Sequence, residues 1–391
     1  MPVLIIKPRS RIFHGHDWVY ASEVLRTTGD PQPGDTVDLK DQRSRPMGSA
    51  IYNPKSQIVA RRYSRRKQAL DLEFFQRRLQ RAAKLREDLP GIEPNLCRLI
   101  WSESDGMPGV IIDRYGDHFV LQTLTLAMDH RKEIIAEALN SQFSPKTIIA
   151  RNDSPSRIAE GMESEEIVLS GSWPGPFEMA HDDLRFQINL GTGQKTGLYL
   201  DQLSNYTAVA RHADGRRVLD CFTNQGGFAL AASKAGASAV TAVDVSETAL
   251  AQAKVNAEIS GAGKILWVEA NVFDDLKKRE SEGQKFDLIV LDPPSFTRNK
   301  KSLKDAMRGY KEIHLRALKM LEPGGMLFTF TCSHHVGWGP FSEVIRDAAN
   351  DAKRTIRLRE SFTQRADHPV LFHLPETEYL KGFGFEVIGA F

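Results

Sequence analysis

The sequence predicts an α/β protein whose C-terminal half is a doubly wound sheet, preceded by a small β-barrel and a small α+β module. Three observations support this class. Residues 216–391 alternate short apolar strands with amphipathic helices, the pattern of a parallel sheet covered on both faces. Residues 1–70 read as short strands separated by Pro and Gly turns. Between them, the hydrophobic period changes near Asp71, and breakers follow at Gly171–Pro176.

The composition is that of a globular protein. The 391 residues are 41% hydrophobic and 26% charged, which is sufficient for two or three domains with their own cores. No apolar run approaches the roughly 18 residues of a membrane span, and the N-terminal apolar run is too short for a secretory signal. We therefore expect a cytoplasmic protein without a membrane partner.

Cysteine usage restricts the chemistry further. The three cysteines, Cys97, Cys221 and Cys332, are an odd number without a C-x-x-C spacing. This pattern argues against a disulfide framework and against a zinc site. We expect no bound metal, and at least one thiol that is available for another role.

The first predicted domain comprises residues 1–70, and its strands are VLIIK, WVYASEV, TVDLKD, GSAIYN and QIVARRYS. Residues 1–90 contain 18 Lys and Arg against 10 Asp and Glu, a net charge of +8, so the other 301 residues carry −6. The densest basic run consists of Arg61, Arg62, Arg65, Arg66 and Lys67. We interpret it as a phosphate-contact surface for nucleic acid. A solvated strand edge is the alternative interpretation.

The second predicted domain comprises residues 71–170. A long amphipathic helix begins at Asp71 and ends before Pro90–Gly91. A turn at Arg114–Asp117 joins two of the strands that follow. These strands are LCRLIWSES, GVIIDRY, HFVLQTLTL, KTIIARND and EEIVLSG, with the helix HRKEIIAEALNSQF among them. The pattern predicts a small α+β module.

The third predicted domain comprises residues 171–391 and begins with a hairpin around His181–Asp183. Its strands are RRVLDCF, AVTAVDV, ILWVEA, FDLIVLD, MLFTFTC, TIRLRES and YLKGFGFEVIG. Ligands of a doubly wound sheet bind outside the carboxyl ends of its strands. The residues that follow those ends are therefore the candidates for a functional site.

The first two strand ends predict a nucleoside site. Gly226 and Gly227 would let a ligand approach the backbone, and Asp244 ends the second strand where a ribose diol needs an acceptor. Because the spacing is not G-x-G-x-x-G, a nicotinamide dinucleotide is the weaker interpretation, and S-adenosyl-L-methionine is favoured. A simple strand-to-helix turn is the structural alternative. The expected cofactor-binding residues of this edge are Asp220, Thr223, Gly226, Asp244, Asn271 and Asp292.

A rigid acidic loop and a cysteine follow the next two strands. Asp292 precedes Pro293–Pro294, which cannot continue a strand ladder and therefore fix the direction of the carboxyl group. Enzymes that methylate amino groups carry an aromatic residue directly after Asp-Pro-Pro, whereas here Ser295 takes that place. Cys332 ends the following strand, so the sheet topology predicts that its sulfur shares a cleft with Asp292.

A methyl donor, an aspartate and a thiol together suit methylation of carbon 5 of a pyrimidine. That carbon becomes nucleophilic when a thiolate adds to carbon 6, while a carboxyl group at the ring nitrogen absorbs the developing charge. We therefore predict Cys332 as the covalent nucleophile and Asp292 as the catalytic carboxyl group. The alternative for a cysteine is a small buried hydrophobic residue, which we expect of Cys97 and Cys221.

With these residues in hand, the chain resembles the ribosomal RNA large-subunit cytosine-5 methyltransferase I-like family. The resemblance extends over nearly the whole chain and rests on an ordered series of motifs. They are HDWVY at 16–20, YNPKS at 52–56, DGMPG at 105–109, DRYGD at 113–117, GQKTGLYLDQ at 193–202, DPPSF at 292–296, TCSHH at 331–335 and DHPV at 367–370.

The resemblance implies an N-terminal PUA domain that binds RNA and a C-terminal Rossmann-like class I methyltransferase domain that uses S-adenosyl-L-methionine. It implies that the target is a cytosine of large-subunit (23S) ribosomal RNA. It also implies that Gln194, Lys195, Thr196 and Tyr199 line the methionine end of the cofactor. The family has only the strand-end cysteine, so another group must remove the carbon 5 proton.

Two other functions stay open at this point. Asp292–Pro294 would also serve an RNA amino-group methyltransferase, and the basic N-terminal domain would also suit a noncatalytic RNA-binding assembly factor. Turnover that survives the loss of Cys332 would favour the first, and a lack of cofactor binding would favour the second. The sequence leaves open whether the chain forms a homodimer.

Overall fold

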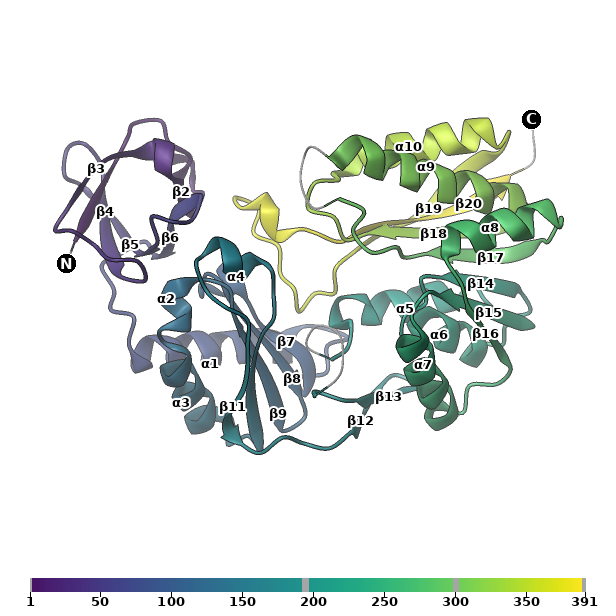
Figure 1. Cartoon of the computed structure of the whole chain (residues 1–391), viewed down its shortest axis with the longest axis horizontal. Coiled ribbons are helices and arrows are strands. Elements are labelled where there is room, and N and C mark those ends of the chain that lie inside the picture. The colour runs from purple at the N-terminus through teal and green to yellow at the C-terminus, as the bar shows by residue number, and fades with distance from the viewer. Residues whose placement is uncertain (1, 192–196, 298–301, 389–391) are drawn as a thin grey trace. The chain divides into compact units, whose positions relative to one another are not determined.

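The chain folds into two compact units, each with its own core. The computed structural model describes residues 2–191, 197–297 and 302–388 (Figure 1). The first unit contains Met1–Phe177, Asn189–Leu200 and Ala366–Thr377, and the second contains Glu178–Ile188, Asp201–Arg365 and Glu378–Phe391. The predicted boundary near residue 70 falls between two sheets of the first unit, and the division into three domains stays a prediction.

Six short strands form the first sheet of the first unit. They are β1 (Val3–Ile6), β2 (Trp18–Tyr20), β3 (Val24–Thr28), β4 (Thr36–Lys40), β5 (Pro46–Tyr52) and β6 (Ile58–Ser64), in the order β2-β6-β5-β4-β1-β3. The pair β1 and β4 is parallel, and the other neighbours are antiparallel. Alternation along β4 turns Val37 and Leu39 into a core with Leu4 and Ile6.

The predicted strand WVYASEV is divided in the structure. A 3-10 turn at Ala21–Glu23 separates β2 from β3. The Glu23 carboxylate causes this break, because it accepts the backbone N–H groups of Tyr20 at 2.8 Å and Arg11 at 3.0 Å. A side chain that satisfies local backbone donors competes with a strand ladder.

A long helix and a second sheet complete the first unit. Helix α1 (Leu72–Asp88) begins after Asp71, whose side chain accepts the Phe74 N–H at 2.9 Å, and it ends before Pro90 as predicted. It packs against α3 (Lys132–Phe143). The five strands are β7 (Leu96–Trp101), β8 (Val110–Tyr115), β9 (His118–Thr123), β10 (Thr147–Asn152) and β11 (Glu165–Gly171), in the order β11-β10-β9-β8-β7. Short helices α2 (Leu126–Asp129) and α4 (Ser156–Ala159) were not expected.

The second unit is a seven-stranded sheet with helices on both faces (Figure 1). Its order is β16-β15-β14-β17-β18-β20-β19. The strands are β14 (Arg217–Cys221), β15 (Ala239–Asp244), β16 (Ile265–Glu269), β17 (Phe286–Leu291), β18 (Leu321–Thr331), β19 (Thr355–Thr363) and β20 (Lys381–Ile388). The helices are α5 (Leu203–Ala210), α6 (Gly227–Lys234), α7 (Glu247–Ser260), α8 (Val272–Ser281), α9 (Leu303–Met320) and α10 (Trp338–Asp351). A hairpin of β12 (Phe177–His181) and β13 (Leu184–Ile188) precedes them.

The expectation of a wholly parallel sheet is wrong for one strand. Strand β20 runs antiparallel to both of its neighbours, β18 and β19. Parallel neighbours need a crossover that is usually a helix, whereas the chain between β19 and β20 contains only the 3-10 turn Pro375–Thr377. Among the described residues, no helix is both long and apolar enough to cross a membrane.

Candidate functional site

The predicted residues of the second unit follow neighbouring strand ends. The pairs β15–β14, β14–β17 and β17–β18 are all parallel, so their carboxyl ends meet at one edge of the sheet. Asp220 lies near the end of β14, Asp244 ends β15, Asp292 follows β17, and Cys332 follows β18. The first and the last of these residues, Asp220 and Cys332, are more than a hundred positions apart in the sequence, and the sheet brings their strand ends to the same edge.

Asp220 is a buried carboxyl group with one oxygen unused by the described residues. Thr223 Oγ1 donates to its Oδ2 at 2.5 Å, and the Ala229 N–H donates to the same oxygen at 3.0 Å. Its Oδ1 is buried and receives no hydrogen bond within the described part of the chain. Burial raises the pKa of Asp220 to about 7, against the two hydrogen bonds that lower it. A buried acceptor of this kind calls for a donor, which the amine of a nucleoside or amino-acid cofactor carries.

We expect Asp220 to make the second unit less stable at pH 7 than at pH 5. A carboxyl group whose pKa rises from 3.8 to about 7 on folding keeps its proton only in the folded chain over that interval. The folded state then binds more protons than the unfolded state, so the free energy of unfolding falls as pH rises. The decrease between pH 5 and pH 7 should be about 2 kcal/mol. The penalty is absent below pH 3.8 and complete above about pH 7.

Urea unfolding at the two pH values, on the wild type and on Asp220→Asn, measures this contribution. The asparagine variant has no titrating group at this position, so its stability should lack that part of the pH dependence. An identical pH dependence in both proteins would contradict the assignment.

The two glycines after β14 are required by packing. Gly226 has φ +88°, and a Cβ on it would lie 3.0 Å from the Trp267 ring. A Cβ on Gly227 would lie 2.2 Å from the ring of Tyr206. The close neighbours of these glycines are therefore aromatic side chains of the same unit. The structural alternative, a tight strand-to-helix turn, accounts for both residues, and a cofactor contact at Gly226 stays a prediction.

Asp244 and Asn271 each hold backbone at the sheet edge. The Asp244 carboxylate accepts the N–H of Asn224 at 2.8 Å and that of Ser246 at 2.9 Å, and it is half-buried. A carboxylate has further lone pairs, so these bonds orient Asp244 and leave acceptor capacity for a diol. Asn271 caps α8 by accepting the Phe273 N–H at 2.9 Å. The predicted cofactor contact of Asn271 stays a prediction.

Asp292 is oriented by a residue that the sequence did not single out. Gln202 Nε2 donates to its Oδ2 at 3.0 Å, and Gln202 Oε1 accepts from Asn205 Nδ2 at 2.6 Å. Asp292 itself is half-buried. A fixed amide donor reduces the freedom of the carboxyl group before any substrate binds. Gln202 belongs to the GQKTGLYLDQ motif, which was the one available signal for it.

Cys332 is half-buried, whereas Cys97 and Cys221 are buried. Burial raises the pKa of Cys221 well above its ordinary value, so that thiol is unreactive. Beside Cys332, Thr331 Oγ1 and the Tyr310 hydroxyl form a hydrogen bond of 2.8 Å. Burial raises the pKa of Tyr310, and the negative charges of Cys332 and Asp292 raise it further. Both predicted catalytic groups thus act electrostatically on the same phenol.

Lys381 is a buried amine next to this end of β18, and sequence reasoning missed it. It opens β20 in register with Thr331, and its Nζ donates to the Tyr379 backbone oxygen at 3.2 Å. Burial lowers the pKa of Lys381, and the negative charges of Glu378 and Cys332 oppose that shift. No sequence signal identifies such a residue, because its position depends on the antiparallel pairing of β20 with β18.

Four further cofactor residues are predicted from the family resemblance. Gln194, Lys195 and Thr196 fall outside the described residues. Tyr199 belongs to the first unit. The contribution of these four residues to cofactor binding, which the family resemblance implies, stays a prediction.

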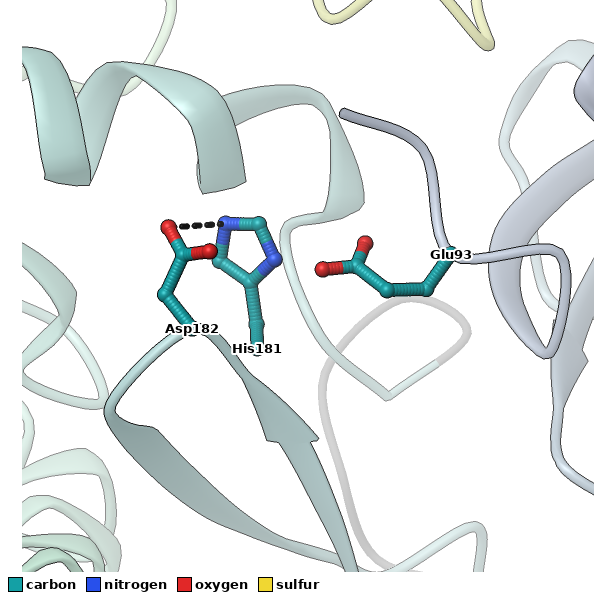
Figure 2. A group of neighbouring side chains, drawn as sticks. All are labelled: Glu93, His181 and Asp182. Atoms are coloured by element: carbon teal, nitrogen blue, oxygen red, sulfur yellow. Dashed lines mark ion pairs between the residues drawn. The ribbon is translucent and has the colours of Figure 1, made fainter. Parts of the chain in front are cut away.

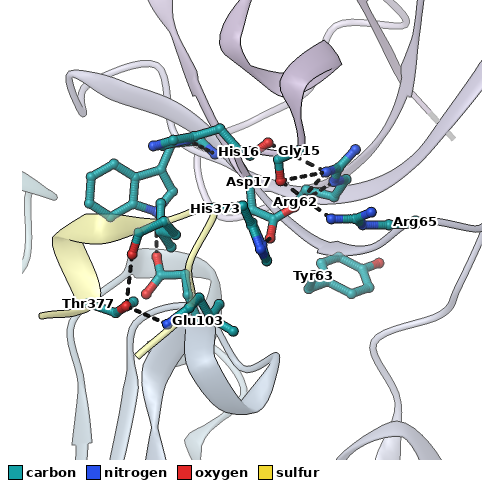
Figure 3. Close-up of polar contacts among 12 residues, drawn as sticks. Gly15, His16, Asp17, Arg62, Tyr63, Arg65, Glu103, His373 and Thr377 are labelled. Atoms are coloured by element: carbon teal, nitrogen blue, oxygen red, sulfur yellow. Dashed lines mark hydrogen bonds and ion pairs between the residues drawn. The ribbon is translucent and has the colours of Figure 1, made fainter. Parts of the chain in front are cut away.

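The basic run of the first unit is divided by its ion pairs. Arg61 Nη1 lies 2.6 Å from Glu103. Arg62 Nη2 lies 2.7 Å from Asp17 (Figure 3). Arg65, Arg66 and Lys67 are exposed. Lys67 Nζ also lies 3.7 Å from Asp38, but its side chain is largely exposed. Arg65, Arg66 and Lys67 are therefore the members of the run most available to an external phosphate, and the RNA contact of the run stays a prediction.

Figure 2 shows a second polar group, at the turn between β12 and β13. His181 Nε2 lies 3.7 Å from the Asp182 carboxylate, which also accepts from Thr207 Oγ1 at 2.6 Å. Glu93, the third side chain drawn, is a residue of the first unit. Within the second unit the pair ties the hairpin turn to α5, and we assign no ligand to it.

Comparison with known proteins agrees with this fold. Residues 160–372 match the S-adenosylmethionine-dependent methyltransferase family, and residues 6–65 match a PUA-like domain. Solved structures share the fold: a protein from Streptococcus mutans is 20% identical with a TM-score of 0.85 over 99% of this chain and 100% of that one. Another, solved in complex with SAH, has a TM-score of 0.86 at 21% identity over the same shares.

Two curated relatives bear the name ribosomal RNA large subunit methyltransferase I. The Erwinia tasmaniensis protein is 40% identical over 393 residues, 99% of both chains. The Shewanella denitrificans protein is 41% identical over 374 residues, 94% of both chains. The fold and the family matches define an S-adenosylmethionine-dependent methyltransferase with a PUA-like domain, as predicted. The chain belongs to the ribosomal RNA large subunit methyltransferase I family.

Proposed function

We propose that the chain methylates carbon 5 of a cytosine in large-subunit (23S) ribosomal RNA through a covalent bond to Cys332. The observation that carries this proposal is the placement of half-buried Cys332 and Asp292 after the neighbouring parallel strands β18 and β17. The name of the curated relatives supports ribosomal RNA as the substrate. S-adenosyl-L-methionine supplies an electrophilic methyl group at this edge when it is bound.

In the proposed reaction, the Cys332 thiolate adds to carbon 6 of the cytosine and forms a carbon–sulfur bond. The electrons of the carbon 5–carbon 6 double bond move toward the ring nitrogen, where the Asp292 carboxyl group is hydrogen-bonded and stabilises the charge. Carbon 5 becomes nucleophilic and acquires the methyl group. A base then removes the carbon 5 proton, and the electron pair of that bond restores the double bond as the thiolate leaves.

Gln202, Tyr310 and Lys381 support the two reacting groups in this scheme. Gln202 holds the Asp292 carboxyl group through the hydrogen bond at 3.0 Å. The Tyr310 hydroxyl is bonded to Thr331, so it fixes the backbone position from which Cys332 projects. The positive charge of Lys381 favours the thiolate form of Cys332, because an adjacent cation stabilises an anion in a partly buried site. We propose them as positioning residues.

The substrate must be extruded from base pairing, because the thiolate and the methyl group reach different atoms of one ring. A PUA-like domain and exposed Arg65, Arg66 and Lys67 support contact with RNA phosphates. We retain a cytoplasmic location as part of this proposal. Formation of a homodimer stays untested, and sedimentation of the purified chain would determine it.

The proposal is tested by mapping 5-methylcytosine in large-subunit ribosomal RNA from cells with and without the gene. One cytosine should lose its methyl group when the gene is deleted and regain it when the gene is restored. In vitro, RNA that contains 5-fluorocytosine at this position should form a complex with the protein that survives denaturing electrophoresis, since fluorine cannot leave as a proton does.

Two outcomes would overturn the proposal. Methyl label on the exocyclic amino group of the base, without a trapped complex, would identify an amino-group methyltransferase that uses Asp292–Pro294. Calorimetry that detects no S-adenosyl-L-methionine binding would instead identify a noncatalytic RNA-binding factor.

A further inference from the structure

A cavity of about 650 Å³ lies in the first unit, between the end of β6, helix α1 and the segment before Thr377. Its walls carry an unusual number of guanidinium groups. The lining arginines are Arg62, Arg65, Arg66, Arg78 and Arg81. Arg78 and Arg81 lie on α1, more than ten positions beyond the basic run, so the sequence did not connect them with it.

The carboxylates of this cavity are already neutralised. Asp17 is paired with Arg62, Glu103 with Arg61, and Asp105 with Arg86. Among the described residues, no carboxylate lies within 4.0 Å of the cationic nitrogens of four other arginines, which are Arg65, Arg66, Arg78 and Arg81. The cavity therefore has a net positive charge, and it favours an anionic ligand.

Arg78 is held in place without a ligand. Its Nη2 donates to the backbone oxygen of Tyr63 at 3.0 Å, and its guanidinium lies 5.1 Å from the centre of the Phe74 ring. It also lies against Gly106, where a Cβ would be 2.8 Å from the guanidinium carbon. Burial and the charges of Arg81, Arg77 and Arg66 lower the pKa of Arg78, and the charge of Asp105 opposes part of that shift. Like charges gathered around a fixed guanidinium gain stability when an anion binds between them.

A turn that lines the same cavity carries a fully exposed aromatic side chain. Phe372 has a relative exposure of 101%, although its neighbours Leu371 and His373 both line the cavity. The turn that carries it is fixed. Thr377 Oγ1 accepts the Leu371 N–H at 2.9 Å, and His373 Nε2 lies 3.2 Å from Asp17 (Figure 3). A ring presented to solvent on an ordered turn has a free face, on which an unpaired base can stack.

We infer that this cavity and Phe372 form a binding groove for single-stranded RNA, in which Arg65, Arg66, Arg78 and Arg81 contact phosphates and Phe372 stacks on a base. The inference deepens the proposed function, because it rests on RNA as the substrate. Phosphate alone would use the arginines and leave Phe372 without a role. A duplex has no exposed base face, so the pairing of aromatic ring and arginines favours a single strand.

Fluorescence anisotropy with a fluorescein-labelled single-stranded RNA of about twelve nucleotides tests the arginines on the full-length protein at several salt concentrations. Arg78→Gln and Arg81→Gln should each weaken binding roughly three- to tenfold and lower the log–log salt slope by about 0.7. Arg43→Gln is the matched control, since Arg43 is exposed and does not line the cavity. Variants at 78 and 81 that bind like Arg43→Gln would overturn the inference.

Three variants at residue 372 test the aromatic ring. Phe372→Ala should weaken single-strand binding roughly five- to a hundredfold without changing the salt slope. Phe372→Trp should retain binding, and Phe372→Leu should lose it, because leucine is apolar but has no planar face. Binding by Phe372→Leu equal to that of the wild type, or an equal loss of duplex binding in Phe372→Ala, would overturn the stacking role.

The two proposals fail in distinguishable ways. Cys332→Ala should bind the labelled RNA with wild-type affinity, since Cys332 belongs to the second unit. RNA binding that depends on Arg78 and Phe372, together with unchanged 5-methylcytosine on gene deletion, would overturn the proposed function alone. Gene-dependent 5-methylcytosine, together with cavity variants that bind RNA normally, would overturn this inference alone.

Discussion

Replacement of Cys332 by alanine is expected to lower methyl transfer to RNA by at least about a thousandfold, because the variant cannot form the bond to carbon 6 of the base. Carbon 5 of cytosine is a poor nucleophile without that addition. Affinity for S-adenosyl-L-methionine should stay within about twofold of the wild type, since the predicted cofactor residues follow other strands. Single-turnover transfer of labelled methyl groups and calorimetry of the cofactor measure the two quantities.

Cys97→Ala is the matched control for this experiment. It removes a buried thiol of the first unit, so it should lower stability modestly and leave the turnover of folded protein unchanged. Cys332→Ala with turnover within tenfold of the wild type would rule out covalent catalysis through this residue. The same variant should also fail to form the complex with 5-fluorocytosine RNA.

Asp105→Ala is expected to destabilise the first unit by about 3–5 kcal/mol, because it leaves a buried guanidinium without its counter-ion. Arg86 is 0% exposed. It donates to the two Asp105 oxygens at 2.6 and 2.8 Å and to the backbone oxygens of Arg98 at 2.9 Å and Asp367 at 2.7 Å. Asp105 also accepts the Trp101 N–H at 2.6 Å. The Asp105 carboxylate thus compensates the charge of Arg86, whose hydrogen bonds connect α1 with β7 and with the segment around residue 367.

Urea unfolding of the purified chain measures this effect, with Asp88→Ala as the control. Asp88 pairs with Lys84 at 2.8 Å on the exposed face of α1, so its loss should cost no more than about 1 kcal/mol. Equal effects of the two substitutions would show that the Arg86 charge is compensated by other groups. The double variant Arg86→Met/Asp105→Leu should be less destabilised than Asp105→Ala, since it buries no charge.

Local patterns in the sequence predicted most of the secondary structure. Asp71 identified the start of α1, because a side-chain cap acts within four residues. Proline and glycine residues identified the ends of strands and the turn between β8 and β9, because their effect on the backbone is also local. The prediction was wrong where a side chain redirected the backbone, as Glu23 does between β2 and β3. It was also wrong for the direction of β20, which the neighbouring strands decide.

The candidate site was predictable in part. The residues that end strands could be named in advance, because a doubly wound sheet always presents the carboxyl ends of its strands to a ligand. Asp220, Asp292 and Cys332 follow from that rule, and they stay proposed site residues. The hydrogen bond from Gln202 to Asp292 and the position of Lys381 came from the structure, although Gln202 lies in a motif of the family resemblance.

The sequence by itself determined the class of sheet, the family and the identity of the strand-end residues, because these depend on hydrophobic period and on motifs within a few positions. Only the tertiary structure decided which arginines are neutralised and which remain available. Arg61 and Arg62 pair with acids that folding brings near them. Arg78 and Arg81, which lie on α1, line the same cavity as residues from the end of β6. The physical reason is range: an ion pair forms between side chains within about 4 Å in space, whatever their separation along the chain.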